Sequence, residues 1–362
     1  MNLNRLISIT ALVSGTLAAA AYSLKLVGKR HHPTYTFADK AVVITGGSRG
    51  LGLVLARMLA EEGARVTLIA RDDAELDRAR QDLIKRGANP NQVSVLAADV
   101  RDQASIRAAI EQARQTWGDI DVLINGAGVI SAGPLQHMQT SDYENQMATH
   151  FWGAWHASQA ALPAMRQQKQ GRIVNIASLA GKIALPHMGP YSASKAALVS
   201  LSESMRIELA RENIIVTTIC PGPMRTGAHV NATYKGRHRE EYTGLALLSS
   251  LPWVSTDARI AARKIIEACR NGEATIVFPR LFNLLPVLNQ VRPDIASKIL
   301  SLVNQWEPAP TPSRKGNVLK EGWDSLSPLA PSTLTVMGDL ATAENNGLRG
   351  HTPLVIGDSA VK

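Results

Sequence analysis

Residues 41–62 read AVVITGGSRGLGLVLARMLAEE, and this stretch decides the fold. The β-branched run Ala41–Thr45 predicts a buried strand, and Leu51–Glu62 predicts a helix that Gly63 ends. Between them, the glycines of TGGSRGLG (45–52) allow a tight turn, and the N–H groups at the start of the following helix favour anions. The stretch therefore indicates either a phosphate-binding unit or merely a tight connection between a strand and a helix.

The sequence beyond this stretch alternates short apolar runs with amphipathic stretches of helical length, which is typical of βαβ units and a parallel sheet. Asp72 and Glu75 form a capping-box pattern that opens a helix ending near Gly87. Further helices are predicted at roughly 102–116, 141–168, 191–212 and 257–271. Further strands are predicted at Arg65–Ala70, Val93–Ala97, Val122–Asn125, Ile173–Ile176, Ile215–Ile219 and Ala274–Val277. Seven strands in one series predict a single doubly wound, Rossmann-type α/β domain over residues 37–280 with a seven-stranded parallel sheet.

The pattern changes after Pro279. Residues 281–306 resemble an amphipathic helical stretch that Pro286 and Pro293 interrupt, and from Glu307 onward scattered proline, serine, threonine and glycine predict an irregular tail. We therefore divide the chain into a hydrophobic segment and linker (1–36), a catalytic domain (37–280) and a C-terminal extension (281–362).

Charge and cysteine content exclude two classes of function. Of the net charge of +9, residues 1–36 contribute +4, and residues 281–362 hold seven basic and seven acidic side chains that cancel. The remaining +5 comes with no cluster of basic and aromatic residues, so nucleic-acid binding is not expected. Cys220 and Cys269 have no metal-ligand spacing, so we expect neither a metal site nor a disulfide framework.

The N-terminus holds 19 uncharged residues, Leu6–Leu24, between Arg5 and a basic cluster that starts at Lys25. A helix of this length spans about 28 Å, which is close to the hydrocarbon thickness of a bilayer. We expect a membrane anchor, with the alternatives of a cleaved signal peptide on an exported protein or a helix lying on the membrane surface. The heavier basic cluster follows the segment, which favours a catalytic domain on the cytoplasmic side.

The end of the second predicted strand points to a particular dinucleotide. An acidic residue there would bind the adenosine ribose 2′-hydroxyl of NAD, but the sequence has Ala70 followed by Arg71, with Arg49 in the glycine turn. Guanidinium groups form bidentate, charge-assisted bonds to phosphate. The two arginines therefore favour NADP(H), unless both are solvated surface side chains.

A third pattern supplies acid–base chemistry. Tyr191 and Lys195 in YSASK lie four residues apart and share one helix face, so the ammonium group can lower the pKa of the phenol. Ser178 lies thirteen residues upstream, after a strand and at the carboxyl edge where such sheets bind ligands. Taken singly, a YxxxK match is weak and Ser178 could be an ordinary turn residue.

Together these motifs resemble the short-chain dehydrogenase/reductase family over about residues 40–280. TGGSRGLG matches the family's TGxxxGxG turn, NGAG at Asn125–Gly128 resembles its NNAG segment, and Pro221–Thr226 matches PGxxxT. Asp99 takes the place of the acid that contacts adenine, and Ser178, Tyr191 and Lys195 take the catalytic places. The cofactor-binding positions given by the motifs and the resemblance are Gly46, Ser48, Arg49, Gly50, Leu51, Gly52, Arg71, Asp99, Val100, Asn125, Gly128, Tyr191, Lys195, Pro221, Gly222 and Thr226.

His150 departs from the family pattern. It stands three residues before Gly153, where the family usually has an asparagine that holds a water in a proton relay to the lysine. An imidazole can also accept and donate hydrogen bonds, so we expect His150 to serve in the relay and to make it sensitive to pH near neutrality, although burial beside Lys195 would lower its pKa. The alternative is a histidine that only packs.

The resemblance implies hydride transfer between a nicotinamide and a carbonyl or alcohol carbon, with Tyr191 exchanging the proton, Lys195 tuning Tyr191, and Ser178 bonding the reacting oxygen. Basic and leucine residues mixed over 227–252, next to the expected anchor, favour an apolar ketone or aldehyde as substrate. The alternatives are a β-ketoacyl-thioester reductase and a non-catalytic nucleotide-sensing protein. The resemblance also suggests a homodimer or homotetramer.

Overall fold

The computed structural model describes residues 35–312, 314–348 and 350–351. The predicted N-terminal segment, Leu6–Leu24, lies outside these residues. No helix in the described ranges combines the length and the apolar character needed to cross a membrane. Residues 36–362 form one compact unit, which therefore includes the C-terminal extension together with the catalytic domain.

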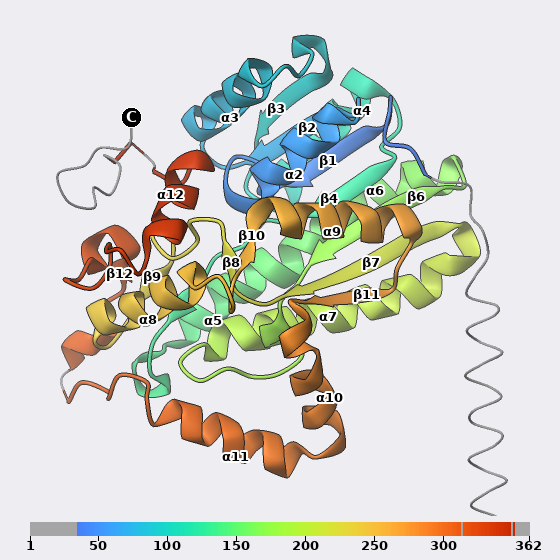
Figure 1. Cartoon of the computed structure of the whole chain (residues 1–362). Helices are drawn as coiled ribbons and strands as arrows, with labels where there is room; N and C mark the ends of the chain where they lie inside the picture. Colours follow the sequence, from blue (N-terminus) through green and yellow to red (C-terminus); the bar gives the residue numbers. More distant parts are fainter. Residues whose placement is uncertain (1–34, 313, 349, 352–362) are drawn as a thin grey trace, which may run out of the picture. The chain divides into compact units, whose positions relative to one another are not determined.

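A seven-stranded sheet with the order β11-β7-β6-β4-β1-β2-β3 forms the centre of this unit, and every pairing in it is parallel (Figure 1). The strands are β1 (Ala41–Thr45), β2 (Arg65–Ala70), β3 (Val93–Ala97), β4 (Val122–Asn125), β6 (Gly171–Ile176), β7 (Ile214–Pro221) and β11 (Thr275–Phe278). The predicted fold is thus confirmed, and the first four strands have their predicted bounds, because each is an apolar run between turn residues. All five residues of β1 are buried.

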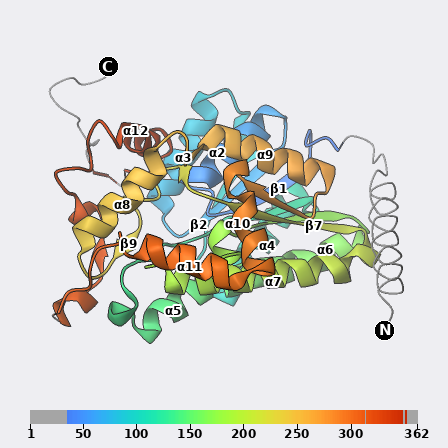
Figure 2. The same cartoon turned by 60° about the horizontal axis from the view of Figure 1, so that its bottom comes forward.

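Helices cover both faces of the sheet (Figures 1 and 2). One face carries α2 (Gly50–Glu61), α3 (Asp73–Lys85) and α9 (Ala258–Asn271). The other carries α4 (Gln103–Trp117), α6 (Gly153–Gln167) and α7 (Gly189–Leu209). On this second face the main core cluster packs Ile106 and Ile110 of α4 and Ala157 and Met165 of α6 against Leu123 of β4. The crossover helices therefore bring the carboxyl ends of the strands to one edge.

The predicted helix 141–168 is divided into three parts. It consists of α5 (Thr140–Met147), one π-helical turn (Ala148–Trp152) and α6. Such π turns are frequent at functional sites, and this one contains His150. The apolar periodicity spans the whole stretch, so the sequence pattern did not reveal the inserted residue.

The predicted capping box is only half correct. Asp72 Oδ1 accepts a hydrogen bond from the amide of Glu75 at 2.8 Å, as expected for an N-cap. The Glu75 carboxylate does not return to the N-cap: it accepts from Ser48 Oγ (3.0 Å) and from the Arg49 guanidinium (2.8 Å). Glu75 therefore ties α3 to the glycine turn.

The predicted helical stretch 281–306 is present, and the tail predicted as irregular from Glu307 onward contains one short strand and one α-helix among irregular segments. After η6 (Arg280–Asn283), α10 (Leu284–Val291) and α11 (Pro293–Asn304) form a helical arm. The chain then returns through β12 (Lys320–Glu321), which pairs antiparallel with β9 (Thr233–Tyr234). The last helix of the described residues is α12 (Val336–Glu344), which packs on α8 (His238–Ser250). The remaining short strands are β5 (Ser131–Ala132), β8 (Met224–Arg225) and β10 (Thr256–Asp257).

Candidate active site

A cavity of about 660 Å³ opens at the carboxyl edge of the sheet. It is lined by seventeen of the eighteen residues that the sequence analysis assigned to the site. They are Gly46, Ser48, Arg49, Gly50, Leu51, Gly52, Arg71, Asp99, Val100, Gly128, His150, Ser178, Tyr191, Lys195, Pro221, Gly222 and Thr226. Residues that lie up to 180 positions apart in the sequence thus meet in one space. Its volume lies within the range usual for ligand pockets.

Asn125 is the one predicted residue that does not line the cavity. It lies buried at the end of β4, where its Nδ2 donates to Asn175 Oδ1 (2.8 Å) and Ser158 Oγ (3.1 Å). Asn125 therefore joins β4 to β6 and α6, and it supports the floor of the cavity rather than lining it.

The glycine turn between β1 and α2 has the close packing that its sequence requires. Gly46 has a φ of +72°, and a Cβ there would lie 2.7 Å from Ala127 Cα. A Cβ on Gly52 would collide with the carbonyl oxygen of Gly46. Because no side chain intervenes, the backbone of the turn itself forms the cavity wall where α2 begins. This arrangement lets backbone N–H groups bind a pyrophosphate.

Basic and acidic side chains gather at the β2–β3 end of the cavity. Arg71 is exposed beside Asp99, and the Asp99 carboxylate is held by Arg101, with Nη2 at 2.6 Å from Oδ2. Burial acts to raise the pKa of Asp99, but the bonds from Arg101 outweigh it and the pKa is lowered, so this carboxylate is ionised. Arg101 was not predicted from the sequence, although its place two residues after Asp99 could have suggested it.

The catalytic candidates converge at the centre of the cavity. Ser178 follows β6 in extended backbone, with its Oγ accepting from the amide of Ala180 (3.1 Å) and lying within hydrogen-bonding reach of Tyr191. Lys195 Nζ donates to the carbonyl of Ile176 (2.8 Å) and lies 5.7 Å from the centre of the Tyr191 ring. The spacing of YxxxK therefore places both groups on the cavity side of α7, as predicted.

The expected lowering of the Tyr191 pKa was wrong for this structure. Burial raises the pKa of the Tyr191 phenol, and the bond with Ser178 only partly opposes that rise. Burial also lowers the pKa of Lys195 to about 7. An ammonium group that is only half protonated at neutral pH gives the phenol little electrostatic help, so Ser178 is the main stabiliser of the phenolate in this arrangement.

His150 lies fully within the protein at the π-helical turn. Its Nε2 accepts from the amide of Val129 (3.1 Å), so Nδ1 carries the proton and donates to Ser194 Oγ (2.8 Å). Its ring meets that of Tyr191 edge to face, with the centroids 5.4 Å apart. Burial, and secondarily Lys195, hold the pKa of His150 well below 6.5. The imidazole is therefore neutral, and it ties the cavity wall at Val129 to the turn of α7 that carries Tyr191.

The C-terminal segment completes the cofactor end of the site. Asn346 Nδ2 donates to the carbonyls of Ser48 (2.8 Å) and Glu75 (3.0 Å), and Arg57 donates to Asn345 Oδ1 (2.8 Å). These contacts join positions that are almost 300 residues apart, and no sequence pattern pointed to them.

Comparisons with known proteins agree with this geometry. A family model described as short chain dehydrogenase matches residues 40–235. The oxidoreductase UcpA of Salmonella typhimurium is 39% identical over 188 residues, which cover 52% of this chain and 70% of UcpA. A putative ketoacyl reductase of the granaticin polyketide synthase from Streptomyces violaceoruber is 36% identical over 212 residues, covering 58% of this chain and 75% of that protein.

Two solved structures are similar to this chain and contain NADPH. L-sorbose reductase from Gluconobacter frateurii, complexed with NADPH and L-sorbose, has a TM-score of 0.60 at 25% identity, covering 68% of this chain and 97% of the reductase. Actinorhodin polyketide ketoreductase with NADPH has a TM-score of 0.59 at 27% identity, covering 67% and 97%. This chain therefore belongs to the short-chain dehydrogenase/reductase family, and it is an oxidoreductase that uses a nicotinamide cofactor.

Proposed function

We propose that the protein is an NADP(H)-dependent carbonyl reductase acting on an apolar ketone or aldehyde. The observation that carries this proposal is the chemical division of the cavity. Its β2–β3 end is lined by Arg49 and Arg71, and its opposite end is lined by aliphatic side chains, with Tyr191 between the two.

The basic end fits an adenosine ribose that bears a 2′-phosphate. Arg71 is exposed at the tip of β2, and Arg49 is fixed by its ion pair with Glu75, whose carboxylate is 6% exposed. A phosphate would receive the charge of Arg71 most directly, because Glu75 already balances much of the charge of Arg49. The NADPH complexes of the two similar reductases support the same preference.

The opposite end fits an apolar substrate. Beyond Tyr191 the cavity is lined by Ile130, Leu185, Met188, Leu245 and Leu248, the last two from α8. No lysine, arginine or carboxylate of the described chain lines this part of the cavity, so a charged substrate would find no partner there.

The proposed chemistry follows from the positions of two side chains. A bound reduced nicotinamide supplies the hydride to the carbonyl carbon. Tyr191 Oη donates its proton to the carbonyl oxygen, and because burial raises the pKa of Tyr191, the phenol stays protonated at neutral pH. Ser178 Oγ donates to the same oxygen and afterwards stabilises the Tyr191 phenolate.

A panel of carbonyl compounds tests this function. Purified protein is expected to oxidise NADPH with a long-chain or polycyclic ketone, and Tyr191→Phe is expected to abolish turnover while NADPH binding stays nearly intact. If no carbonyl compound supports NADPH oxidation, or if Tyr191→Phe retains most of the activity, the proposal is wrong.

The second candidate is reduction of a β-ketoacyl thioester, which two similar proteins favour by their names. Arg237 and Arg239 at the start of α8 are compatible with the phosphate of a carrier thioester. A β-ketoacyl thioester in the same panel separates the candidates, because a kcat/KM far above that of simple ketones would favour the thioester. The non-catalytic alternative is not retained, since the chain belongs to an oxidoreductase family.

We further propose that residues 6–24 anchor the protein in a membrane, with the catalytic domain on the cytoplasmic side, where NADP is held. The support is the 19-residue uncharged stretch and its basic flanks. Full-length protein is then expected in the membrane fraction after a high-salt wash. A processed form without this stretch in an extracytoplasmic fraction would instead establish a cleaved signal peptide.

A further inference from the structure

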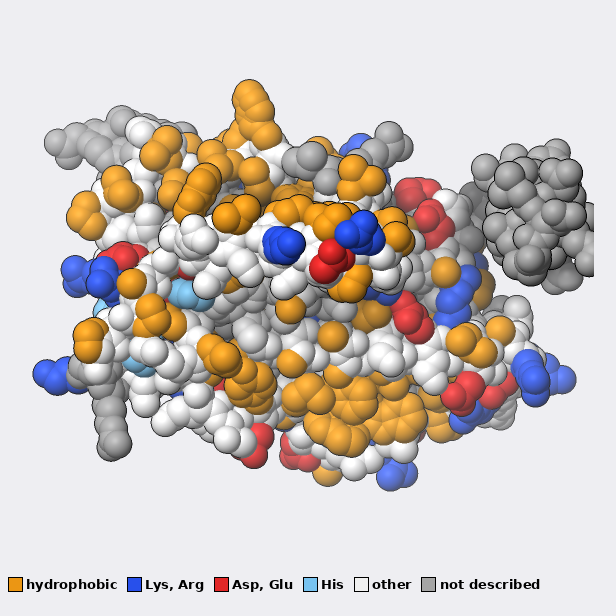
Figure 3. Space-filling model, turned by 90° about the horizontal axis from the view of Figure 1, so that it is seen from below, with side chains coloured by type: hydrophobic (Ala, Val, Ile, Leu, Met, Phe, Trp, Pro, Cys, Tyr) orange, Lys and Arg blue, Asp and Glu red, His pale blue; other side chains and the backbone are white. Residues whose placement is uncertain are grey.

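The arm formed by α10 and α11 exposes an apolar stripe on each of its two helices. On α10, Leu284, Val287 and Val291 follow the i, i+3, i+7 spacing of one helix face, and Leu284 is 76% exposed. On α11 and just after it, the same spacing continues through exposed residues that end in a tryptophan. They are Ile295, Ile299, Leu302, Val303 and Trp306. Figure 3 shows the apolar side chains gathered on the side of the molecule where the arm lies.

The described structure leaves this apolar face uncovered. Among the residues with described side chains, α10 buries only Pro286 and α11 buries only Ala296. An amphipathic helix normally gains its stability by burying the apolar stripe against a core. Contiguous apolar patches of this kind mark protein or membrane contacts.

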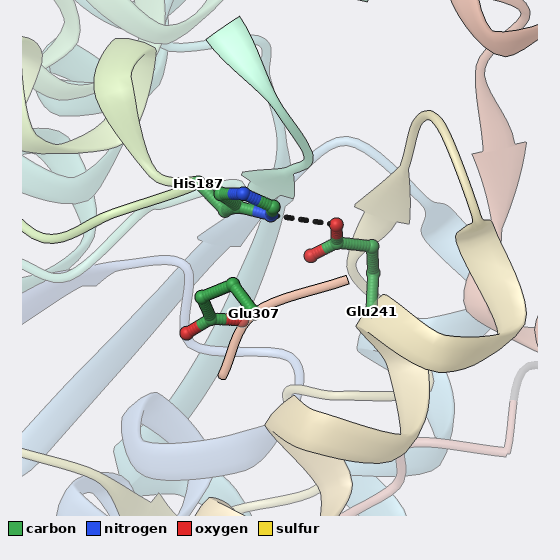
Figure 4. A group of neighbouring side chains, drawn as sticks. All are labelled: His187, Glu241 and Glu307. Atoms are coloured by element: carbon green, nitrogen blue, oxygen red, sulfur yellow. Dashed lines mark hydrogen bonds and ion pairs between the residues drawn. The ribbon is translucent and has the colours of Figure 1, made fainter. Parts of the chain in front are cut away.

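Both ends of the arm are attached beside the cavity. At its start, Phe282 packs so closely on Gly222 of the cavity wall that a Cβ on Gly222 would lie 3.2 Å from the Phe282 ring. At its end, Glu307 lies beside His187 and Glu241 (Figure 4). One imidazole nitrogen of His187 and one carboxylate oxygen from each glutamate lie within 4.8 Å of one another.

This cluster connects the arm to the substrate end of the cavity. His187 belongs to the loop whose Leu185 and Met188 line the cavity, and its Nδ1 lies 2.7 Å from Oε1 of Glu241 on α8. Burial acts to lower the pKa of His187, but the hydrogen bond and charge of the Glu241 carboxylate outweigh it and the pKa is raised. A partner bound to the arm would therefore lie next to the loop that contains His187 and next to α8, and both segments line the substrate end of the cavity.

We propose that the α10–α11 arm docks on the surface of a lipid bilayer and that the apolar substrate enters the cavity from that surface. The choice of a bilayer as the partner rests on two observations. Trp306 is 92% exposed at the end of the stripe, and tryptophan favours the membrane–water interface. The 34 residues that precede the described structure include the uncharged stretch Leu6–Leu24. Only 11 residues separate this stretch from Thr36, so an anchor there would keep the domain at a membrane. The entry route rests on the proposed apolar substrate.

Residues 36–362 test the docking without the N-terminal stretch, because they form a compact unit of their own. We expect this fragment to co-sediment with phosphatidylcholine vesicles, and added phosphatidylglycerol or salt to change binding little. The arm carries Arg292, Asp294 and Lys298 but no larger charge excess, so burial of apolar surface drives the binding.

Matched triple variants locate the surface that binds. The arm variant V287S/L302S/W306S is expected to lower the partition coefficient about tenfold or more, since each lost apolar side chain weakens insertion. The control variant I260S/L329S/L334S removes three exposed apolar side chains that do not belong to the arm, and it is expected to bind vesicles like the parent fragment. Circular dichroism and NADPH binding verify that both variants are folded.

Three outcomes would overturn the docking. The fragment could fail to bind vesicles, the control could weaken binding as much as the arm variant, or the fragment could be a dimer that the arm variant dissociates, which would make the face a contact between copies.

The entry route has its own test in active protein: the arm variant should raise KM for a vesicle-borne ketone and leave KM for a water-soluble ketone unchanged. An equal effect on both would reject the entry route. Absence of any carbonyl reduction would reject the proposed function and leave the vesicle result standing.

Discussion

The backbone carbonyl of Asn345 accepts a hydrogen bond of 2.9 Å from the amide of Gly50, the first residue of α2. A residue near the C-terminus thus occupies one of the N–H groups at the start of the helix that faces the cofactor cavity. Two neighbouring hydrogen bonds hold the same region. Asn346 donates to the carbonyl of Ser48 in the glycine turn, and the buried Arg57 of α2 donates to the side chain of Asn345. The shape of the glycine turn therefore depends on the end of the chain.

The first prediction concerns Asn346. Asn346→Ala removes the hydrogen bond from Nδ2 to the Ser48 carbonyl in the glycine turn and the one to the Glu75 carbonyl in α3, so the Kd for NADPH should rise by the equivalent of about 1–3 kcal/mol. Fluorescence titration with NADPH measures the change. Asn304→Ala at the exposed end of α11 serves as the control and should bind NADPH like the parent protein. An unchanged Kd in Asn346→Ala would mean that the tail only covers the turn.

The second prediction concerns the choice between NADPH and NADH. Arg71→Ala should reduce the preference for NADPH by the equivalent of about 1.5–3 kcal/mol, because one charge-assisted bond to the 2′-phosphate is lost. The ratio of kcat/KM for the two cofactors gives the measurement. Arg211→Ala, on the surface after α7, is the matched control. Wild-type protein that uses NADH as well as NADPH would contradict the interpretation of Arg49 and Arg71.

The third prediction concerns His150, for which the relay function stays a prediction. His150→Ala should lower kcat roughly ten- to a hundredfold, a barrier increase of about 1.4–2.7 kcal/mol. His150→Asn should retain much of the activity, since an amide can also accept from Val129. An Ala variant with the kcat of the wild type would make His150 a packing residue.

The pH dependence expected for His150 from the sequence is corrected by its surroundings. Because its pKa is lowered well below 6.5, the imidazole does not titrate between pH 6 and 7. The pH–rate profiles of the wild type and His150→Asn should therefore coincide in that range. A wild-type inflection near pH 6.5 that His150→Asn removes would show that the ring gains a proton there.

The fourth prediction concerns the cost of burying Lys195. The pKa of this ammonium group is 10.5 in the unfolded chain and about 7 in the folded protein, so folding releases protons between about pH 7 and pH 10.5. The burial cost is fully present below pH 7 and disappears as the pH rises to 10.5. Lys195→Met should therefore raise Tm at pH 7 by roughly 2–4 °C for each kcal/mol gained in the free energy of unfolding. The same substitution should abolish turnover.

Thermal melts of Lys195→Met and of the parent protein at pH 7, 8.5 and 10 check this prediction. The difference in Tm should shrink with rising pH. A Lys195→Met variant that is less stable than the parent protein at every pH would show that the hydrogen bond to Ile176 outweighs the cost of burial. Lys182→Met, whose ammonium group is paired with Glu203, provides the comparison for a lysine nearer the surface.

The sequence alone determined the sheet, the glycine turn and the catalytic spacing. These features are local: β1 is an apolar run with buried residues throughout, Gly52 is required by its contact with the Gly46 carbonyl six residues away, and the four-residue interval from Tyr191 to Lys195 follows the helix period. Local patterns leave a trace in the sequence because neighbouring residues must satisfy the same strand, turn or helix.

Only the tertiary structure decided what surrounds these elements. The bond from Gly50 to Asn345, the π-helical turn that places His150 against Val129, and the removal of Asn125 from the cavity wall all depend on residues far apart in the chain. The pKa of Lys195 likewise depends on how completely other segments exclude water from it. Such contacts and burial have no period along the sequence, so they exist only once the chain has folded.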